Sequence, residues 1–187
     1  MTSATTTDFA TVTGDYTIDA VHSRFGFVAR HAMVTKVRGS FNEFEGTTTI
    51  DGNDPSKSAV SVTLDVASID TRNAQRDGHL RTNDFLDVEN FPKITFVSTS
   101  IEHDGGNDFR VTGDLTIKDV TKSITMPLEF QGAATDPFGN KRIGLEGSAQ
   151  IVRSEFGVTY NAVLESGGVM VSDKITLEFE ISAIKNV

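Results

Sequence analysis

The residues of this chain that are best suited to chemistry lie in one short polar segment. Asp77, His79 and Asp84 stand close together in the run TRNAQRDGHLRTNDFLDVENFP, which begins at Thr71. Carboxylates and imidazoles grouped in this way can serve in acid–base catalysis or bind a metal ion. Asp77 and His79 are only two residues apart, however, so they would not share one face of a helix. The competing interpretation is structural: Asp77 and Asp84 tie the ends of a short helix and its flanking loop to the rest of the fold.

Other reactive arrangements do not appear in the sequence. The four histidines, at positions 22, 31, 79 and 103, show no metal-ligand spacing of the H-x-x-x-H type. There is no G-x-S-x-G nucleophile motif and no glycine loop of the kind that holds phosphates. The chain has no cysteine, which excludes disulfides, thiolate-bound zinc and thiol catalysis. The sequence therefore predicts neither a catalytic residue nor a metal site.

The elements that must position these residues are mainly β-strands, because apolar residues alternate along most of the chain. We expect strands over residues 16–18, 25–31, 37–41, 46–51, 60–66, 94–98, 109–117, 124–130, 145–153 and 175–181. A short helix is expected near Ala74 to Arg81, and Pro92 ends any helical structure. Amphipathic strands joined mostly by turns predict an antiparallel barrel or sandwich. Strands of about ten residues favour a closed barrel, and about eight strands leave room for one small ligand.

A few polar residues interrupt the apolar faces of these strands. His31 ends the row of Phe25, Phe27 and Ala29, and Arg153 follows Ile151. Buried polar groups need hydrogen-bond partners, and buried charges need pairing. One interpretation is a satisfied cluster that caps the barrel, such as an ion pair between Arg153 and Asp173. The other is a polar mouth that holds the head group of an amphipathic ligand, whose tail lies in the apolar interior.

Length and composition limit the remaining choices. The 187 residues fit one domain, with a flexible lead-in over residues 1–14 and a barrel domain over residues 15–187. The 13 phenylalanines, without tryptophan, suit either a dry core or an apolar ligand. The net charge of −9 argues against binding to nucleic acid or to an anionic membrane surface. Because neither a signal peptide nor a membrane span is evident, we expect a cytoplasmic protein without membrane insertion.

Three segments resemble the YceI family of polyisoprenoid-binding proteins. They are HSRFGFVARHAMVTKVRGSFNEFEG, SIDTRNAQRDGHLRTNDFLDVENFPKITFVSTS and GDLTIKDVTKSITMPLEF. The combination of H-S-x-x-x-F-x-x-x-H, R-D-x-H-L-x-x-x-D-F and F-P-x-I-x-F-x-S is specific, and the resemblance extends from about Asp15 to Ile184. It implies an all-β fold: an extended, lipocalin-like antiparallel β-barrel of about eight strands with a short helix packed against it. The D-F-F-D form usual in the family reads Asp84-Phe85-Leu86-Asp87 here.

The resemblance also implies a function and a site. The family holds a long amphiphile in the barrel, such as a polyisoprenoid, an isoprenoid quinone or a fatty-acid derivative, and is not known for enzymes; no cofactor is implied beyond this ligand. The residues expected to line the cavity or to reach the ligand are Phe25, Phe27, Phe41, Phe85, Phe91, Phe96, Leu128, Leu145 and Ile151. The recurrent polar positions of the family, which serve either a polar mouth or the architecture, are matched by His22, His31, Asp77, His79, Asp84 and Arg153.

Two other functions stay open at this point. One is an enzyme that acts on a bound lipid or quinone with His31 or His79 as acid–base. The other is an interaction module whose barrel is filled by its own side chains. The sequence also leaves homodimerisation open, and it does not identify the lipid.

Overall fold

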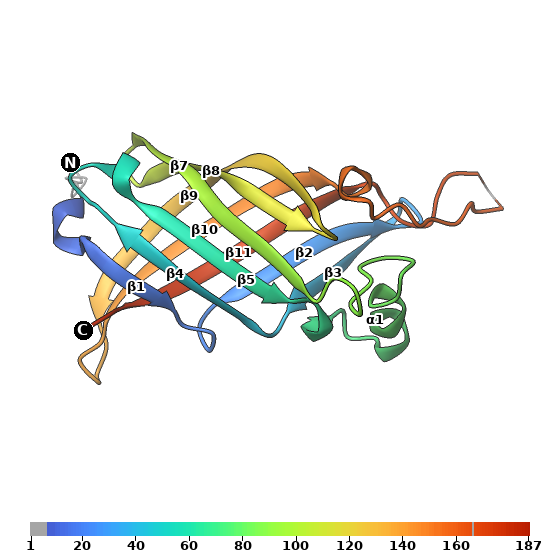
Figure 1. The fold of residues 1–187 in the computed structure, drawn as a ribbon, viewed down its shortest axis with the longest axis horizontal. Helices are drawn as coiled ribbons and strands as arrows, with labels where there is room; N and C mark the ends of the chain where they lie inside the picture. Colours follow the sequence, from blue (N-terminus) through green and yellow to red (C-terminus); the bar gives the residue numbers. More distant parts are fainter. Residues whose placement is uncertain (1–6, 166) are drawn as a thin grey trace.

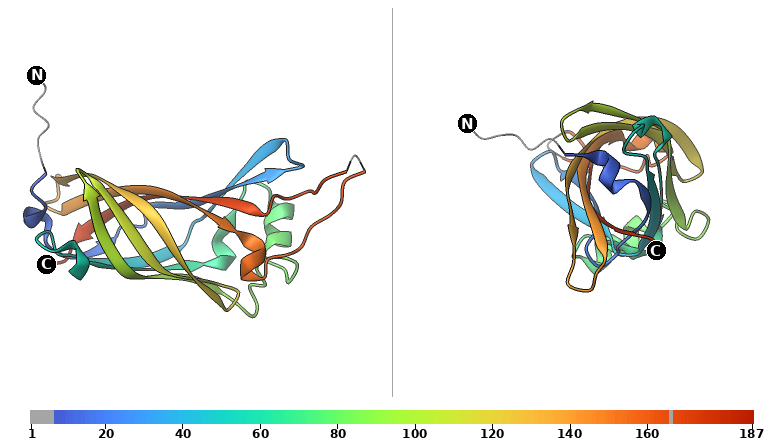
Figure 2. Two further views of the ribbon diagram at one scale, coloured as in Figure 1. Left: turned by 90° about the horizontal axis from the view of Figure 1, so that it is seen from above. Right: turned by 90° about the vertical axis from the view of Figure 1, so that its left-hand side faces the viewer.

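The computed structural model describes residues 7–165 and 167–187. The predicted lead-in over residues 1–14 therefore lies partly outside the described residues, from 1 to 6. In the described part, Phe9–Val12 form a 3₁₀ turn, η1. The side chain of Asp8 begins this turn by accepting a hydrogen bond from the amide of Ala10, and Val12 is buried in the core. This segment lies across one end of the barrel (Figure 2).

The described part of the chain forms eleven β-strands, and all their pairings are antiparallel. They are β1 (Gly14–Ile18), β2 (Arg24–His31), β3 (Thr35–Phe41), β4 (Phe44–Ile50), β5 (Ala59–Asp65), β6 (Ile69–Asp70), β7 (Lys93–Gly105), β8 (Asp108–Ile117), β9 (Val120–Thr135), β10 (Lys141–Val152) and β11 (Lys174–Lys185). Three further 3₁₀ turns follow β4, β5 and β10: η2 (Pro55–Lys57), η3 (Val66–Ser68) and η4 (Arg153–Phe156).

Eight of these strands close into a ring, as the sequence predicted. Their order is β1-β4-β5-β7-β8-β9-β10-β11, and β1 pairs with β11 to complete the circle. Close to the seam, Tyr16 lies opposite Lys185. The remaining strands β2, β3 and β6 continue the wall beyond β1, since β2 pairs with the first half of β11. The barrel is therefore long and narrow (Figure 1).

Several strands are longer than the sequence indicated. The expected strand 124–130 extends over Val120–Thr135, because polar residues continue the ladder beyond its apolar row. Its entry turn holds Lys118 and Asp119 at φ 50° and 64°, a conformation usually given to Asn and Gly. Without a glycine signal at that turn, the sequence pattern marks only the apolar part of the strand.

The single α-helix of the described residues confirms the prediction closely. It spans Ala74–Leu80, and the side chain of Asn73 caps it by accepting a hydrogen bond from the amide of Arg76. The helix lies at the end of the barrel opposite η1, beside the β2–β3 hairpin (Figure 1).

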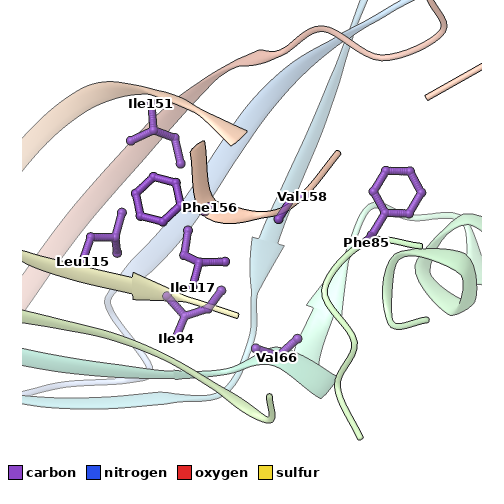
Figure 3. Close-up of a cluster of buried hydrophobic side chains, with 8 residues drawn as sticks. All are labelled: Val66, Phe85, Ile94, Leu115, Ile117, Ile151, Phe156 and Val158. Atoms are coloured by element: carbon purple, nitrogen blue, oxygen red, sulfur yellow. The ribbon is translucent and has the colours of Figure 1, made fainter. Parts of the chain in front are cut away.

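A buried apolar cluster fills the barrel at this α1 end (Figure 3). Its members are Val66, Phe85, Ile94, Leu115, Ile117, Ile151, Phe156 and Val158. The turn η4 directs Phe156 into the barrel, where its ring is almost completely buried. A second cluster around Tyr16 and Phe130 closes the η1 end, where the Tyr16 hydroxyl donates a 2.8 Å hydrogen bond to the carbonyl of Val12. Burial raises the pKa of Tyr16.

Candidate functional site

An apolar cavity of about 180 Å³ lies inside the barrel between the two clusters. Its wall is built mainly by the inward-facing residues of β5, β7, β8, β9 and β11, which alternate with outward-facing polar residues. The apolar residues that line it include Val60, Val62, Leu64, Ile94, Phe96, Ile101, Phe109, Val111, Leu115, Ile124, Met126, Leu128, Phe130, Leu145, Leu177, Phe179 and Ile181. The alternation follows directly from the period-2 pattern of the sequence.

Glycines allow several phenylalanine rings to lie along the wall. A Cβ on Gly147 would stand 2.5 Å from the ring of Phe179, its partner on the neighbouring strand. A Cβ on Gly113 would likewise meet the ring of Phe96 at 2.4 Å. In both places the ring occupies the space that a side chain on the glycine would need. The rings therefore rest against the backbone of the wall and leave the centre of the barrel open.

The cavity is small for a long ligand. Sites for drug-sized molecules usually measure about 300–1,000 Å³, against about 180 Å³ here. A lipid of several isoprene units would need the rings of residues such as Phe96 and Phe179 to turn, or one of the packed ends to open. Such a change is feasible because the side chains that would move are apolar, so their movement breaks no hydrogen bond.

Polar groups approach the cavity at the η1 end. Asp51, Gly52, Pro55 and Ser58, from the β4–β5 connection, line it there beside Phe9 and Val12 of η1. The Ser58 hydroxyl accepts a hydrogen bond from the amide of Asp51 at 2.9 Å, and the Asp51 carboxylate accepts from two later amides. We call Asp51, Gly52, Pro55 and Ser58 the polar rim. Sequence reasoning missed this rim and Phe9, because it treated the first fourteen residues as a lead-in and residues 52–55 as a turn.

Five of the residues predicted for the cavity do line it, and four do not. The five are Phe25, Phe41, Phe96, Leu128 and Leu145. The ring of Phe27 instead packs on Phe41, with ring centres 5.8 Å apart, and covers Gly39. Phe85 and Ile151 belong to the cluster at the α1 end, and Phe91 is half-buried in the loop before β7. Whether any of these residues contacts a ligand stays a prediction.

The structure does not bring the six predicted polar residues together at the cavity. His22 lies in the β1–β2 turn, where its Nδ1 is 2.6 Å from the carboxylate of Asp19. His31 is exposed at the end of β2, and its backbone bridges to Val171. The other four lie in or beside the α1 end of the barrel, where each has partners of its own.

Arg153 is buried and holds a loop. Its guanidinium donates hydrogen bonds to the carbonyls of Val158, Tyr160 and Ser172 at 2.8–2.9 Å. Burial lowers the pKa of Arg153, and the Asp173 charge opposes that shift. The Asp173 carboxylate itself accepts from the amide and the hydroxyl of Ser154. Among the described residues Arg153 therefore bonds to main-chain carbonyls, in place of the direct ion pair with Asp173 that the sequence suggested.

The acidic residues near α1 also have structural partners. Asp77 is buried and accepts hydrogen bonds from the amide and the hydroxyl of Thr71. His79 Nε2 lies 2.8 Å from the Asp84 carboxylate, and its ring packs edge-on against Phe85 and Tyr160. No three His, Asp or Glu side chains of residues 7–165 and 167–187 gather closely enough to hold a metal ion. This arrangement fastens the helix to the segment that follows η4.

An ion-pair network ties two turns together. Arg142 donates hydrogen bonds of 2.7 Å to the carboxylates of Asp19 and Asp136. The hydrogen bond from Arg142, supported by His22, lowers the pKa of Asp19 to about 2. The same guanidinium holds the pKa of Asp136 far below its usual value. The network therefore fixes the β1–β2 turn against the β9–β10 turn.

Comparisons with known proteins agree with this architecture. The model of the YceI-like domain matches residues 16–183. A UPF0312 protein of Staphylococcus aureus (strain USA300) is 38% identical over 170 residues, which cover 90% of this chain and 95% of the relative. The crystal structure of BcnA from Burkholderia cenocepacia is 26% identical, with a TM-score of 0.78, and the match covers 88% of this chain and 98% of that one.

A further solved structure shares the fold at lower identity. It is a polyisoprenoid-binding domain from Saccharophagus degradans implicated in plant cell wall breakdown, and it is 17% identical with a TM-score of 0.70. That match covers 91% of this chain and 98% of the other. No helix in the described part of the present chain is both long and apolar enough to cross a membrane.

Proposed function

The chain belongs to the YceI-like family, and from that premise we propose that it is a non-catalytic binding protein that holds a long amphiphilic lipid in its barrel. The lipid class is a polyisoprenoid, an isoprenoid quinone or a fatty-acid derivative. The name of the structural relative from Saccharophagus degradans supports a polyisoprenoid. The single observation that carries the proposal is the apolar cavity between the two packed ends of the barrel.

The chemistry of the cavity favours a tail without polar groups. Thr48 is a hydroxyl residue in the wall, and its hydroxyl already donates to the carbonyl of Ala59. Among the described residues, no buried side-chain nitrogen or oxygen lacks a hydrogen-bond partner. A polar substrate would therefore meet no buried side-chain group of the described residues that lacks a partner. An alkyl or prenyl chain needs none, because each CH₂ removed from water contributes about 0.8 kcal/mol.

We place the head group of the lipid at the polar rim. Asp51 and Ser58 stand where the cavity approaches the surface, beside the turn η1. The tail would then run along the barrel toward Ile94 and Leu115, at the boundary with the α1-end cluster. Neither His31 nor His79 lines the cavity, so an enzyme that uses either histidine on the bound lipid has less support.

The test is organic extraction of the purified protein, followed by mass spectrometry of the extract. We expect a stoichiometric long-chain isoprenoid or a related lipid, and re-extraction after incubation should return it unchanged. An empty extract after incubation with a lipid mixture, or no uptake from detergent micelles, would refute the binding proposal. A chemically altered lipid that requires His79 would instead support the enzyme.

A further inference from the structure

The β2–β3 hairpin carries a concentration of positive charge that the net charge of −9 conceals. Between Asp19 and Glu43 the sequence has no acidic residue, but it has three arginines and one lysine. Arg30 lies opposite Lys36, and Arg38 lies opposite Val28. Since Arg30 and Val28 are two residues apart, as are Lys36 and Arg38, these three cations share one face of the hairpin.

These three cations are also free of internal partners. Arg30, Lys36 and Arg38 are exposed, and no ion pair within residues 7–165 and 167–187 involves any of them. By contrast, Arg24, nearer the body of the barrel, lies 3.9 Å from Glu178. The outer part of the hairpin therefore keeps its charge available for a partner outside the chain.

Apolar side chains cover the tip of the same hairpin. Met33 and Val34 are 57% and 75% exposed. The turn holds Ala32 and Met33 at φ 52° and 61°, where Asn and Gly are preferred. The preference of the turn therefore does not explain why these two residues occupy it. Residues held in such a conformation are a reason to look for function.

A second segment, which lies between η4 and β11, joins the tip. The amide of Ala32 donates a 2.7 Å hydrogen bond to the carbonyl of Met170, and the amide of Ser172 donates to the carbonyl of Arg30. This segment adds Val163, which is 84% exposed, and Met170. Hairpin and segment project together at the α1 end of the molecule (Figures 1 and 2). We call Met33, Val34, Val163 and Met170, with Arg30, Lys36 and Arg38, the basic tip.

We propose that the basic tip docks the protein on an anionic phospholipid surface. Apolar residues that enter the head-group region, flanked by cations that meet anionic lipids, are the elements of such peripheral binding. Because electrostatic fields decay within about 8–10 Å at physiological salt, a projecting tip can touch the surface while the acidic body stays screened. A second copy suits the tip less well, since a twofold contact would bring like charges together. The proposal rests on this surface alone and does not depend on which ligand fills the cavity.

The test is cosedimentation of the full chain with vesicles. Vesicles of phosphatidylglycerol and phosphatidylcholine in equal parts should bind the protein, and binding should weaken with added salt, whereas pure phosphatidylcholine should bind it far less. Replacing Arg30, Lys36 and Arg38 together by Gln should reduce binding by about a hundredfold, at about fivefold per basic residue. The matched control replaces Lys57, Lys141 and Lys185 by Gln, which makes the same change in net charge. Lys57 lies in η2, Lys141 begins β10 and Lys185 ends β11, all toward the η1 end of the barrel, so this variant should bind like the wild type.

A second variant removes Met33 from the tip without endangering the fold. Ala32→Asn with Met33→Gly installs the dipeptide that this turn prefers, so the hairpin should be at least as stable as before. Vesicle binding should nevertheless fall about tenfold or more, since the exposed Met33 side chain that would enter the lipid head-group region is lost. The matched control is Phe138→Ser, because Phe138 is 89% exposed on a turn at the η1 end.

Three results would overturn the docking proposal. The first is equal binding of the wild type to both kinds of vesicle, and the second is wild-type binding by both tip variants. The third is a wild type that forms a concentration-dependent dimer but binds no vesicles, with tip variants that no longer form the dimer. The last would identify the tip as a self-association surface. Uptake of lipid from detergent micelles needs no bilayer, so it reports on the cavity separately from docking. Tip variants that take up lipid from micelles but do not bind vesicles support docking. A wild type that neither takes up lipid nor binds vesicles refutes both proposals.

Discussion

The ring of Phe179 lies over Gly147, its directly paired neighbour on β10, so closely that a Cβ on the glycine would stand 2.5 Å from the ring. The same Cβ would also come within 2.6 Å of the carbonyl of Pro127. The Pro127 carbonyl prevents a side chain on residue 147 from moving away from the ring, so the ring itself would have to move. The open direction is the centre of the barrel.

Gly147→Ala should therefore close the cavity. We expect the Phe179 ring to turn inward and lipid affinity to fall about tenfold or more, since loss of contact with only two CH₂ groups has that effect. Overpacking should lower the free energy of unfolding by about 1–3 kcal/mol. Lipid uptake and thermal unfolding would measure the two effects. Gly144→Ala is the control, because its Cβ would meet only the Cβ of Gln131, at 3.3 Å. Adding Phe179→Ala to Gly147→Ala should restore part of the uptake, because it removes the ring but not the contact with the Pro127 carbonyl. No gain in uptake over Gly147→Ala alone would contradict the steric explanation.

Phe9→Ala should loosen the η1 end of the barrel. The ring of Phe9 packs edge-on against Phe109 and Phe130, with ring centres 5.2 and 5.4 Å apart, and it lines the cavity. Each such aromatic pair contributes about 0.5–1.5 kcal/mol beyond its buried area. We expect lipid release to become faster, as measured by transfer to empty acceptor vesicles, with little change in the folded structure. Ala10→Ser, at an exposed position of the same turn, is the control. Unchanged release from the Phe9 variant would exclude this end as the exit.

Arg153→Met should separate architecture from ligand binding. The substitution keeps an apolar stem but leaves the carbonyls of Val158, Tyr160 and Ser172 without their donor. Each buried acceptor left unsatisfied costs about 1–3 kcal/mol, so the variant should unfold at clearly lower denaturant concentration. The lipid bound per folded molecule should stay the same. If the variant bound lipids with a different head group at full occupancy, Arg153 would instead be a ligand-binding residue.

The Asp19–Arg142 pair predicts a specific response to acid. The pKa of Asp19 in the folded protein is about 2, below the value of about 3.9 in an unfolded chain. Its stabilising contribution is therefore fully present above about pH 4 and is lost as the pH falls toward 2. Arg142→Gln should lower the free energy of unfolding at pH 7 and should flatten its dependence on pH between 4 and 2. Arg110→Gln, which removes only exposed pairs with Glu102 and Asp104, should leave that slope unchanged.

The barrel and the helix follow from the sequence because they depend on local patterns. The alternation of Ile175, Leu177 and Phe179 specifies a strand and its inner face, and Asn73 specifies where the helix begins. The site depends on contacts between residues far apart in the chain, and alternation does not encode them. Nothing in the sequence around Arg153 says that its partners are main-chain carbonyls of the loop that follows. Nothing around Phe9 says that it meets Phe109.

The polar rim was missed for a related reason. Asp51 and Ser58 make hydrogen bonds to nearby amides that any turn could contain, so their sequence signal is that of a turn. Their position beside the cavity arises only when β4 and β5 are placed in the closed ring. The motifs of the resemblance instead point to Asp77, His79 and Asp84 near α1, whose contacts hold the helix in place.

The pairing of Tyr16 with Lys185 has a consequence for biosynthesis. The strand that closes the ring comes far later in the chain than β1, so one edge of β1 has no β11 to pair with until the ribosome has made all the strands between them. At about 5–20 residues per second, that wait lasts on the order of ten seconds or more. During this time the future lumen is an open apolar trough. A newly made chain could therefore enclose its first lipid as the ring closes, before any passage through the wall is needed.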